Sequence, residues 1–144
     1  MKKYVLACVL TVAAVAAWGQ EYSPEKDFRV ETVRGGVAIV EYLGKATTVN
    51  IPPKIGNQSV HRIEPWAFAG TRLVSVTIPN GVVAIGEWAF AANRLTSVTI
   101  PASVTSIGDE AFAGNDLSSV TVPRGAVLGV RVFDQDVAVR RDRS

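Results

Sequence analysis

The sequence has few of the residue types that most catalytic and metal sites use. It contains one cysteine, Cys8, and one histidine, His61. Disulfides and thiolate metal sites are therefore excluded from the chain beyond its N-terminal segment. There is also no glycine-rich phosphate loop, no HExxH spacing and no nucleophile elbow. We predict no catalytic residue, no metal site and no cofactor.

An excess of charge of either sign is absent as well. The formal net charge of +2 comes from Lys2 and Lys3, because none of the thirteen Asp and Glu residues precedes residue 21. The remainder of the chain is neutral, so no overall electric field attracts a polyanion. We expect no nucleic-acid partner.

Long apolar runs occur only at the N-terminus. Residues 4–18 are almost entirely apolar, follow Lys2 and Lys3, and end in small residues, which is typical of a secretory signal peptide. The run is shorter than the roughly 20 residues that span a bilayer. We predict a signal peptide over 1–20, with cleavage near Gly19 to Glu21. A lipid-anchored leader through Cys8 is the alternative, but the apolar run continues for ten residues beyond this cysteine.

The leader predicts an exported protein that is periplasmic, at the cell surface or secreted, with no stable membrane insertion after cleavage. We expect a monomer.

The rest of the chain repeats itself. Residues 73–94 and 95–116 share thirteen identities in twenty-two positions, among them Leu, Val, Ile, Pro, Gly, Ala and Phe in the same order. Parts of the same pattern extend forward to Phe133 and backward to Ile63. A fixed period of this length is typical of a solenoid in which stacked coils bury one another. We count about four coils, with the two outer ones irregular.

Each unit predicts a strand followed by a short helical turn. In "SVTIP" apolar and polar residues alternate, so the strand buries one face and ends at the proline. The segments "EWAFAAN" and "DEAFAGN" suggest a single helical turn that directs a Phe into the core. The fold class is therefore an α/β repeat solenoid. Two inward columns are expected, Ile63/Ile85/Ile107/Leu128 and Phe68/Phe90/Phe112/Phe133.

The pattern "LTSVTIPASVTSIGDEAFAGN" resembles the BspA-like, treponemal-type leucine-rich repeats of bacterial surface proteins. The resemblance extends from about Phe28 to about Phe133 and includes the irregular opening unit "VNIPPKIGNQSVHRIEPWAF". It implies a leucine-rich-repeat solenoid over 49–133. It also implies a role in adhesion or in contact with a host or neighbouring cell.

The segments that flank the repeats are predicted to differ from each other. Residues 21–48 contain two alternating runs around Gly35 and Gly36, which indicate a β-hairpin that caps the first coil. Residues 134–144 are polar and rich in arginine, so we expect a disordered tail there.

Outward strand residues form the first candidate binding surface. They make two polar columns that would line one broad face, although hydroxyl residues also suit any exposed sheet. The candidate binding face comprises Thr48, Asn50, Ser75, Thr77, Ser97, Thr99, Ser119 and Thr121.

Trp66 and Trp88 form the second candidate surface. They occupy equivalent positions, and the third unit has Glu110 in the same place, so the position is not deep core. Exposed and stacked indoles can anchor a protein partner or a sugar ring. Packing against the neighbouring coil is the alternative.

A hydrolase built on His61 and the acidic residues is not expected. His61 stands where later units have Val83 and Thr105, between inward positions. Asp109 and Glu110 begin a turn, where acidic side chains suit the local dipole. We therefore predict an exported, non-enzymatic module that binds a host, matrix or neighbouring-cell surface protein. The alternative is a glycan-binding module that uses the two tryptophans.

Overall fold

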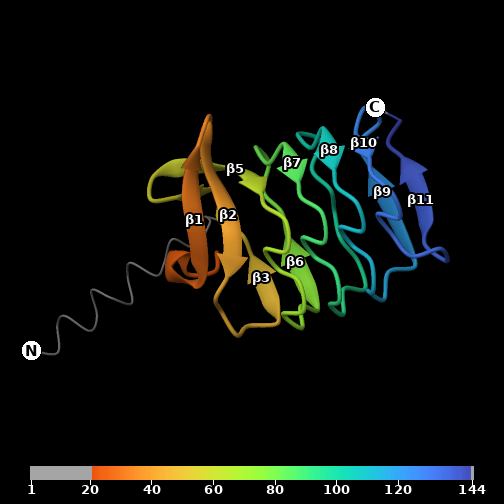
Figure 1. The fold of residues 1–144 in the computed structure, drawn as a ribbon, viewed down its shortest axis with the longest axis horizontal. Coiled ribbons are helices and arrows are strands. Elements are labelled where there is room, and N and C mark those ends of the chain that lie inside the picture. The colour runs from red at the N-terminus through yellow and green to blue at the C-terminus, as the bar shows by residue number, and fades with distance from the viewer. Residues whose placement is uncertain (1–20, 144) are drawn as a thin grey trace, which may run out of the picture.

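A computed structural model describes residues 21–143, so the predicted signal peptide lies outside the described residues. The chain forms a stack of coils that starts at the orange end of Figure 1 and finishes at the blue end. After the short 3-10 turn η1 (Glu25–Asp27) all its elements are strands. These are β1 (Phe28–Val33), β2 (Gly36–Tyr42), β3 (Thr48–Asn50), β4 (Lys54–Ile55), β5 (Gln58–Ile63), β6 (Ser75–Thr77), β7 (Ala84–Ile85), β8 (Ser106–Ile107), β9 (Ser119–Val122), β10 (Val127–Leu128) and β11 (Ala138–Arg141).

The front sheet faces the viewer in Figure 1 and has the order β1-β2-β5-β7-β8-β10, with β4 paired to β5. From β2 to β10 the strands of this order are parallel, because each coil returns to the same face in the same direction, whereas β4 is antiparallel to β5. β1 pairs antiparallel with β2 around Gly35 and Gly36, so a hairpin closes the N-terminal end of this sheet.

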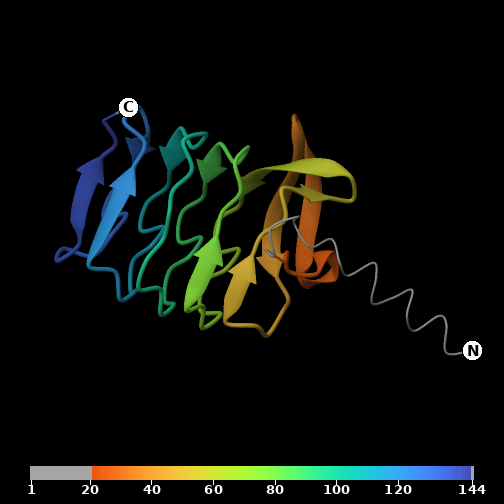
Figure 2. The ribbon, with the colours of Figure 1, turned by 180° about the vertical axis from the view of Figure 1, so that it is seen from behind.

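The back sheet faces the viewer in Figure 2 and contains the parallel pairs β3–β6 and β9–β11. Residues 95–100 lie between these pairs without a regular strand, yet they continue the stack. Arg94 N donates to Leu73 O at 2.8 Å, and Asp116 N donates to Leu95 O at 2.9 Å. The inward residues of this face, such as Val76, Ile78 and Ile100, are buried.

The stack has about five turns, which corrects the predicted count of four. The additional first turn contains β2, in which Ile39 aligns with Ile63 and Tyr42 stacks on Phe68 at 5.3 Å. An extra loop and a register shift move these residues off the twenty-two-residue period. The last turn closes with β11, which aligns with β9 over four residues.

The predicted disordered tail is therefore also corrected. Residues 138–141 are a strand, because their backbone groups continue the ladder of the coil below. The polar side chains gave no sign of this pairing.

The predicted helical turn is wrong. Among residues 21–143 the only helical segment is η1. In each coil two reverse turns follow one another instead, as shown by Ala67 N bonding to Glu64 O at 3.3 Å and Ala69 N bonding to Trp66 O at 3.1 Å. Trp66 has a φ of 65°, and a left-handed residue cannot continue a right-handed helix.

The two predicted core columns are confirmed. Ile63, Ile85, Ile107 and Leu128 align across adjacent front strands. Phe68, Phe90 and Phe112 are fully buried, with ring centroids 4.9 and 5.1 Å apart, and Phe133 lies 5.4 Å beyond Phe112. No helix of the described segment is both long enough and apolar enough to cross a membrane.

Candidate binding surfaces

The eight residues of the predicted binding face lie on the back sheet. Thr48 aligns with Ser75, and Asn50 aligns with Thr77. All eight side chains are exposed except Asn50, which is half-buried. Asn50 Nδ2 donates to Glu21 O, and Asn50 N donates to Ser23 Oγ, both at 2.9 Å. Asn50 therefore holds the segment before η1 and contributes little to an open face.

Thr48 stands beside Ser75 at the start of the serine row, and the other six hydroxyls form two rows across three coils. The rows are Ser75/Ser97/Ser119 and Thr77/Thr99/Thr121, and they end against Ala138 and Arg140 of β11. Within residues 21–143 none of these six hydroxyls makes a side-chain hydrogen bond. By contrast, Thr71 Oγ1 bonds to Phe68 O at 2.8 Å and Ser103 Oγ bonds to Val82 O at 2.8 Å. No side-chain partner within the described segment therefore competes with another molecule for these hydroxyls.

Trp66 and Trp88 are brought together at a corner between the sheets. Their ring centroids are 5.0 Å apart with an interplanar angle of 2°. Trp66 is 56% exposed, whereas Trp88 is half-buried. Each indole covers one face of the other, so the pair presents ring edges and its two outer faces. It does not form one continuous aromatic platform.

The corner column continues with two charged residues. Glu110 and Arg131 take the next two positions, and the Arg131 guanidinium donates to Glu110 Oε1 at 2.8 Å. Like the tryptophans, both have positive φ angles, 53° and 48°. The column thus changes from aromatic to ionic along the stack while its backbone geometry stays the same.

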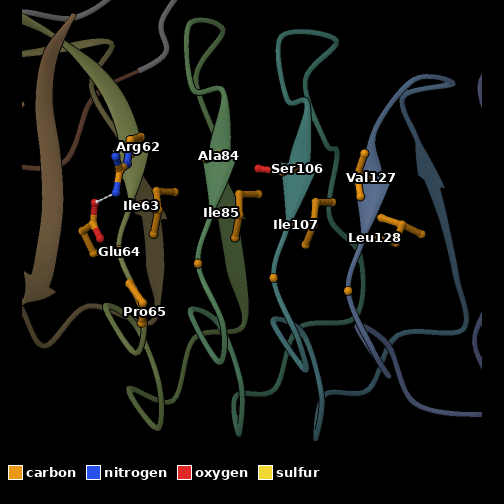
Figure 3. A pocket seen from close by; sticks show the side chains of 13 residues that line it. Arg62, Ile63, Glu64, Pro65, Ala84, Ile85, Ser106, Ile107, Val127 and Leu128 are labelled. Carbon is orange, nitrogen blue, oxygen red and sulfur yellow. Dashed lines mark ion pairs between the residues drawn. The ribbon is translucent and has the colours of Figure 1, made fainter. Parts of the chain in front are cut away.

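A groove on the front sheet was not predicted. It has a volume of about 410 Å³ and crosses four coils (Figure 3). Arg62 and Glu64 form an ion pair of 2.6 Å at its end near β5. The rest of the wall combines the small side chains of Ala84 and Ser106 and three glycines with larger apolar side chains, such as Ile85 and Val127. The small residues two places before Gly86 and Gly108, which are Ala84 and Ser106, were the sequence signal for this groove.

The glycines of the groove are explained by coil stacking. A Cβ on Gly86 would lie 2.5 Å from Pro65 N, and one on Gly108 would lie 2.6 Å from Glu87 N. The adjacent coils are too close for any side chain at these positions. The groove is therefore a product of the stack, and its glycines give no evidence of a ligand.

The residues considered for catalysis have structural contacts. His61 is half-buried, and its ring lies 3.2 Å from where a Cβ on Gly35 would be. Asp109 Oδ1 accepts a hydrogen bond from Val130 N at 2.7 Å, and Glu110 pairs with Arg131. Among residues 21–143 no group of three or more His, Cys, Asp or Glu side chains is arranged to hold a metal ion.

Comparison with solved structures places this fold beside bacterial leucine-rich-repeat proteins. A T. pallidum leucine-rich-repeat protein (TpLRR) is 26% identical, with a TM-score of 0.68 over 85% of this chain and 65% of its own. One from Bacteroides capillosus is 24% identical, with a TM-score of 0.68 over 81% of this chain and 94% of its own. One from Bacteroides ovatus is 26% identical, with a TM-score of 0.51 over 79% of this chain and 39% of its own.

The chain thus spans less than two thirds of the T. pallidum protein. Comparison with curated proteins gives no match. The BspA type leucine rich repeat region matches residues 42–138 in six copies. The chain therefore belongs to the BspA-type leucine-rich-repeat family.

Proposed function

We propose that this protein is an exported, non-enzymatic module that binds another protein through the back sheet of its solenoid. One observation carries the proposal: six exposed hydroxyls stand in two rows and have no side-chain partner among residues 21–143. Leucine-rich-repeat proteins generally mediate protein interactions, and membership of the family supports the same function.

The rows suit a protein partner for a geometric reason. Adjacent coils of a parallel stack lie about 4.8 Å apart, so each row offers regularly spaced donors and acceptors. A partner's backbone or polar side chains can bond along a row without the large desolvation penalty of buried charges. The rows extend across three coils, from β6 to β9.

Adhesion at the cell surface is part of the proposal. BspA-type proteins are typically bacterial surface proteins, and the predicted leader over residues 1–20 supports export. The partner class that we propose is a protein of the host, the matrix or a neighbouring cell.

The test compares capture by the wild-type protein with capture by a double variant, Thr77→Arg plus Thr99→Arg. Both are offered as bait to outer-surface and host extracts. Thr32→Arg, an exposed threonine of β1, is the matched control. The proposal requires that the double variant loses specific partners while its melting temperature and the control's capture stay unchanged. Unchanged capture by the double variant would refute the binding face.

Glycan binding is the second candidate, and the 56% exposure of Trp66 favours it. A sugar ring stacks on an aromatic face, and the more exposed indole, Trp66, is the one that can offer such a face. The parallel stacking of the pair weakens the case because their inner faces cover each other. A glycan array with wild-type protein and with Trp66→Ala plus Trp88→Ala separates the two functions. A blank array, or equal signals from both proteins, would reject the glycan function.

A further inference from the structure

Among the strands of residues 21–143, β11 is the last of the back sheet and has an open edge. β11 pairs with β9 on one side, and its four residues are all exposed (Figure 2). The opposite end of this sheet is closed, because Ser23 N donates to Asn50 O at 2.8 Å and covers the edge of β3. The two ends of the solenoid are therefore different.

Two residues of β11 have backbone groups that do not bond to β9. Ala138 N donates to Ser118 O at 3.0 Å, and Asp142 N donates to Val122 O at 2.8 Å. Alternate residues of a parallel strand direct their N–H and C=O groups to the same neighbour. The N–H and C=O groups of Val139 and Arg141 consequently point away from β9, toward solvent.

The side chains of β11 alternate in chemistry. Val139 aligns with buried Val120, continues the core column and is 43% exposed. Arg140 aligns with exposed Thr121 on the outer surface and has no side-chain partner among residues 21–143. Arg141 Nη1 donates to Pro123 O at 3.1 Å and Ala126 O at 2.6 Å, so this side chain crosses the end of the core.

The charges near β11 indicate whether a second copy of this chain or a different partner occupies its open edge. A symmetrical pair with a second copy would gather six arginines, Arg140, Arg141 and Arg143 from each copy, beside only two aspartates, Asp142 from each. Like charges close together across strands are destabilising, whereas opposite charges are favourable. The arginines thus oppose self-pairing and favour an acidic strand.

We propose that β11 binds an extended segment of a partner protein in which apolar and acidic residues alternate. The segment adds to the back sheet as a further strand, with backbone bonds to Val139 and Arg141. Its apolar residues cover Val139, and its carboxylates face Arg140. This site is independent of the hydroxyl rows, so either can fail without the other.

The test uses short labelled peptides with blocked ends, one of alternating Val and Glu and one of alternating Val and Lys. Binding is followed by fluorescence anisotropy. The wild-type protein is expected to bind the Val/Glu peptide saturably and at least about five-fold more tightly than the Val/Lys peptide. Val139→Pro removes a free N–H that β9 does not use, so it abolishes binding while the circular dichroism spectrum stays native.

If the Val139→Pro variant does not fold, Arg140→Glu still tests the proposal. It reverses the preference between the two peptides, whereas Arg34→Glu, the same charge change at the hairpin tip, leaves the preference unchanged. Equal affinities for both peptides, or an unchanged preference in Arg140→Glu, would overturn the proposal. So would a concentration-dependent dimer in ultracentrifugation that Val139→Pro dissociates, because a second copy would then occupy the edge.

Discussion

Asn93 joins its own coil to the coil of Phe68. Its Nδ2 donates to Phe68 O at 2.8 Å and to Phe90 O at 2.9 Å, while its Oδ1 accepts from Leu73 N at 2.9 Å. Asn115 repeats the arrangement one coil later, with bonds to Phe90 O, Phe112 O and Leu95 N. The recurring asparagine thus satisfies backbone groups that the turn leaves without partners in the ladder.

Replacing Asn93 with Ala should destabilise the protein strongly. Several main-chain groups would lose their partner in a buried site, and each unsatisfied group costs about 1–3 kcal/mol. Urea unfolding followed by circular dichroism measures the loss. Asn80→Ala, at an exposed turn, is the control and should change stability by less than about 0.5 kcal/mol. Equal midpoints for the two variants would contradict the assignment.

Gly108 and Gly125 should respond in opposite ways to alanine. A Cβ at Gly108 would lie 2.6 Å from Glu87 N, whereas one at Gly125 would have nothing within 4 Å. Gly108→Ala must separate two coils and should cost about 1–3 kcal/mol or more. Gly125→Ala should be neutral or stabilise by up to about 1 kcal/mol by restricting the unfolded chain. Thermal melts of both variants would show whether the coils are as close as the structure indicates.

Truncation of Phe90 should destabilise the protein more than truncation of Phe133. Phe90 is fully buried between Phe68 and Phe112, while Phe133 is 8% exposed and, among the rings of residues 21–143, stacks on Phe112 alone. Phe90→Ala should cost about 3–5 kcal/mol, a large part of a typical total stability of about 5–15 kcal/mol. Phe133→Ala should cost less, because its side chain has a neighbour ring on one side only. A larger loss for Phe133→Ala in urea melts would disprove this order.

Trp66 should tolerate glycine better than alanine. Its φ of 65° is costly for any residue with a Cβ, by roughly 1–2 kcal/mol, and glycine avoids this cost. Both substitutions remove the stacking on Trp88, so the difference between the two variants isolates the backbone conformation. We expect Trp66→Gly to unfold at higher urea than Trp66→Ala. The reverse order would mean that the backbone is not left-handed at this position.

Ionisation of Tyr42 should lower the free energy of unfolding at alkaline pH. Burial, with a smaller contribution from the charge of Asp27, raises the pKa of Tyr42 above its ordinary value of 10.0. The fold therefore favours the neutral phenol, whose hydroxyl donates to Ala46 O at 3.2 Å. This stabilisation is complete below the ordinary pKa and is lost as the pH rises through the raised pKa.

The measurement compares wild type with Tyr42→Phe in urea melts from neutral pH to above about pH 10. Wild type should be the more stable of the two at neutral pH, and the difference should shrink in alkali. A difference that does not change with pH would show that Tyr42 has no part in the alkaline loss of stability.

Periodicity predicted most of the stack. A residue that recurs every twenty-two positions must occupy the same place in every coil, so Ile85 and Ile107, or Phe90 and Phe112, could be assigned to inward columns directly. The same argument placed Trp66 beside Trp88, which the structure shows stacked at 5.0 Å. The hydroxyl rows of the candidate face followed from alternation along "SVTIP".

The errors occurred where local propensity was used in place of the period, or where the period does not hold. "EWAFAAN" has helical composition, but Trp88 has a φ of 57° and the segment makes two reverse turns. β2 and β11 do not fit the twenty-two-residue period. They join the stack through backbone hydrogen bonds, which depend little on side-chain identity. The polar composition of residues 134–144 likewise gave no indication that the Arg141 side chain crosses the end of the core.

The sequence alone therefore determined the repeat, its inward columns and the outward hydroxyls. Residues that recur at a constant spacing must occupy equivalent positions in successive coils, because only then are all of them buried or exposed alike. Only the tertiary structure decided how many turns residues 21–143 make, how each corner bends and which segments join the stack at its two ends. These features depend on backbone hydrogen bonds between neighbouring coils, such as that from Ala138 N to Ser118 O. Such bonds are available to almost any residue and so leave no pattern in the sequence.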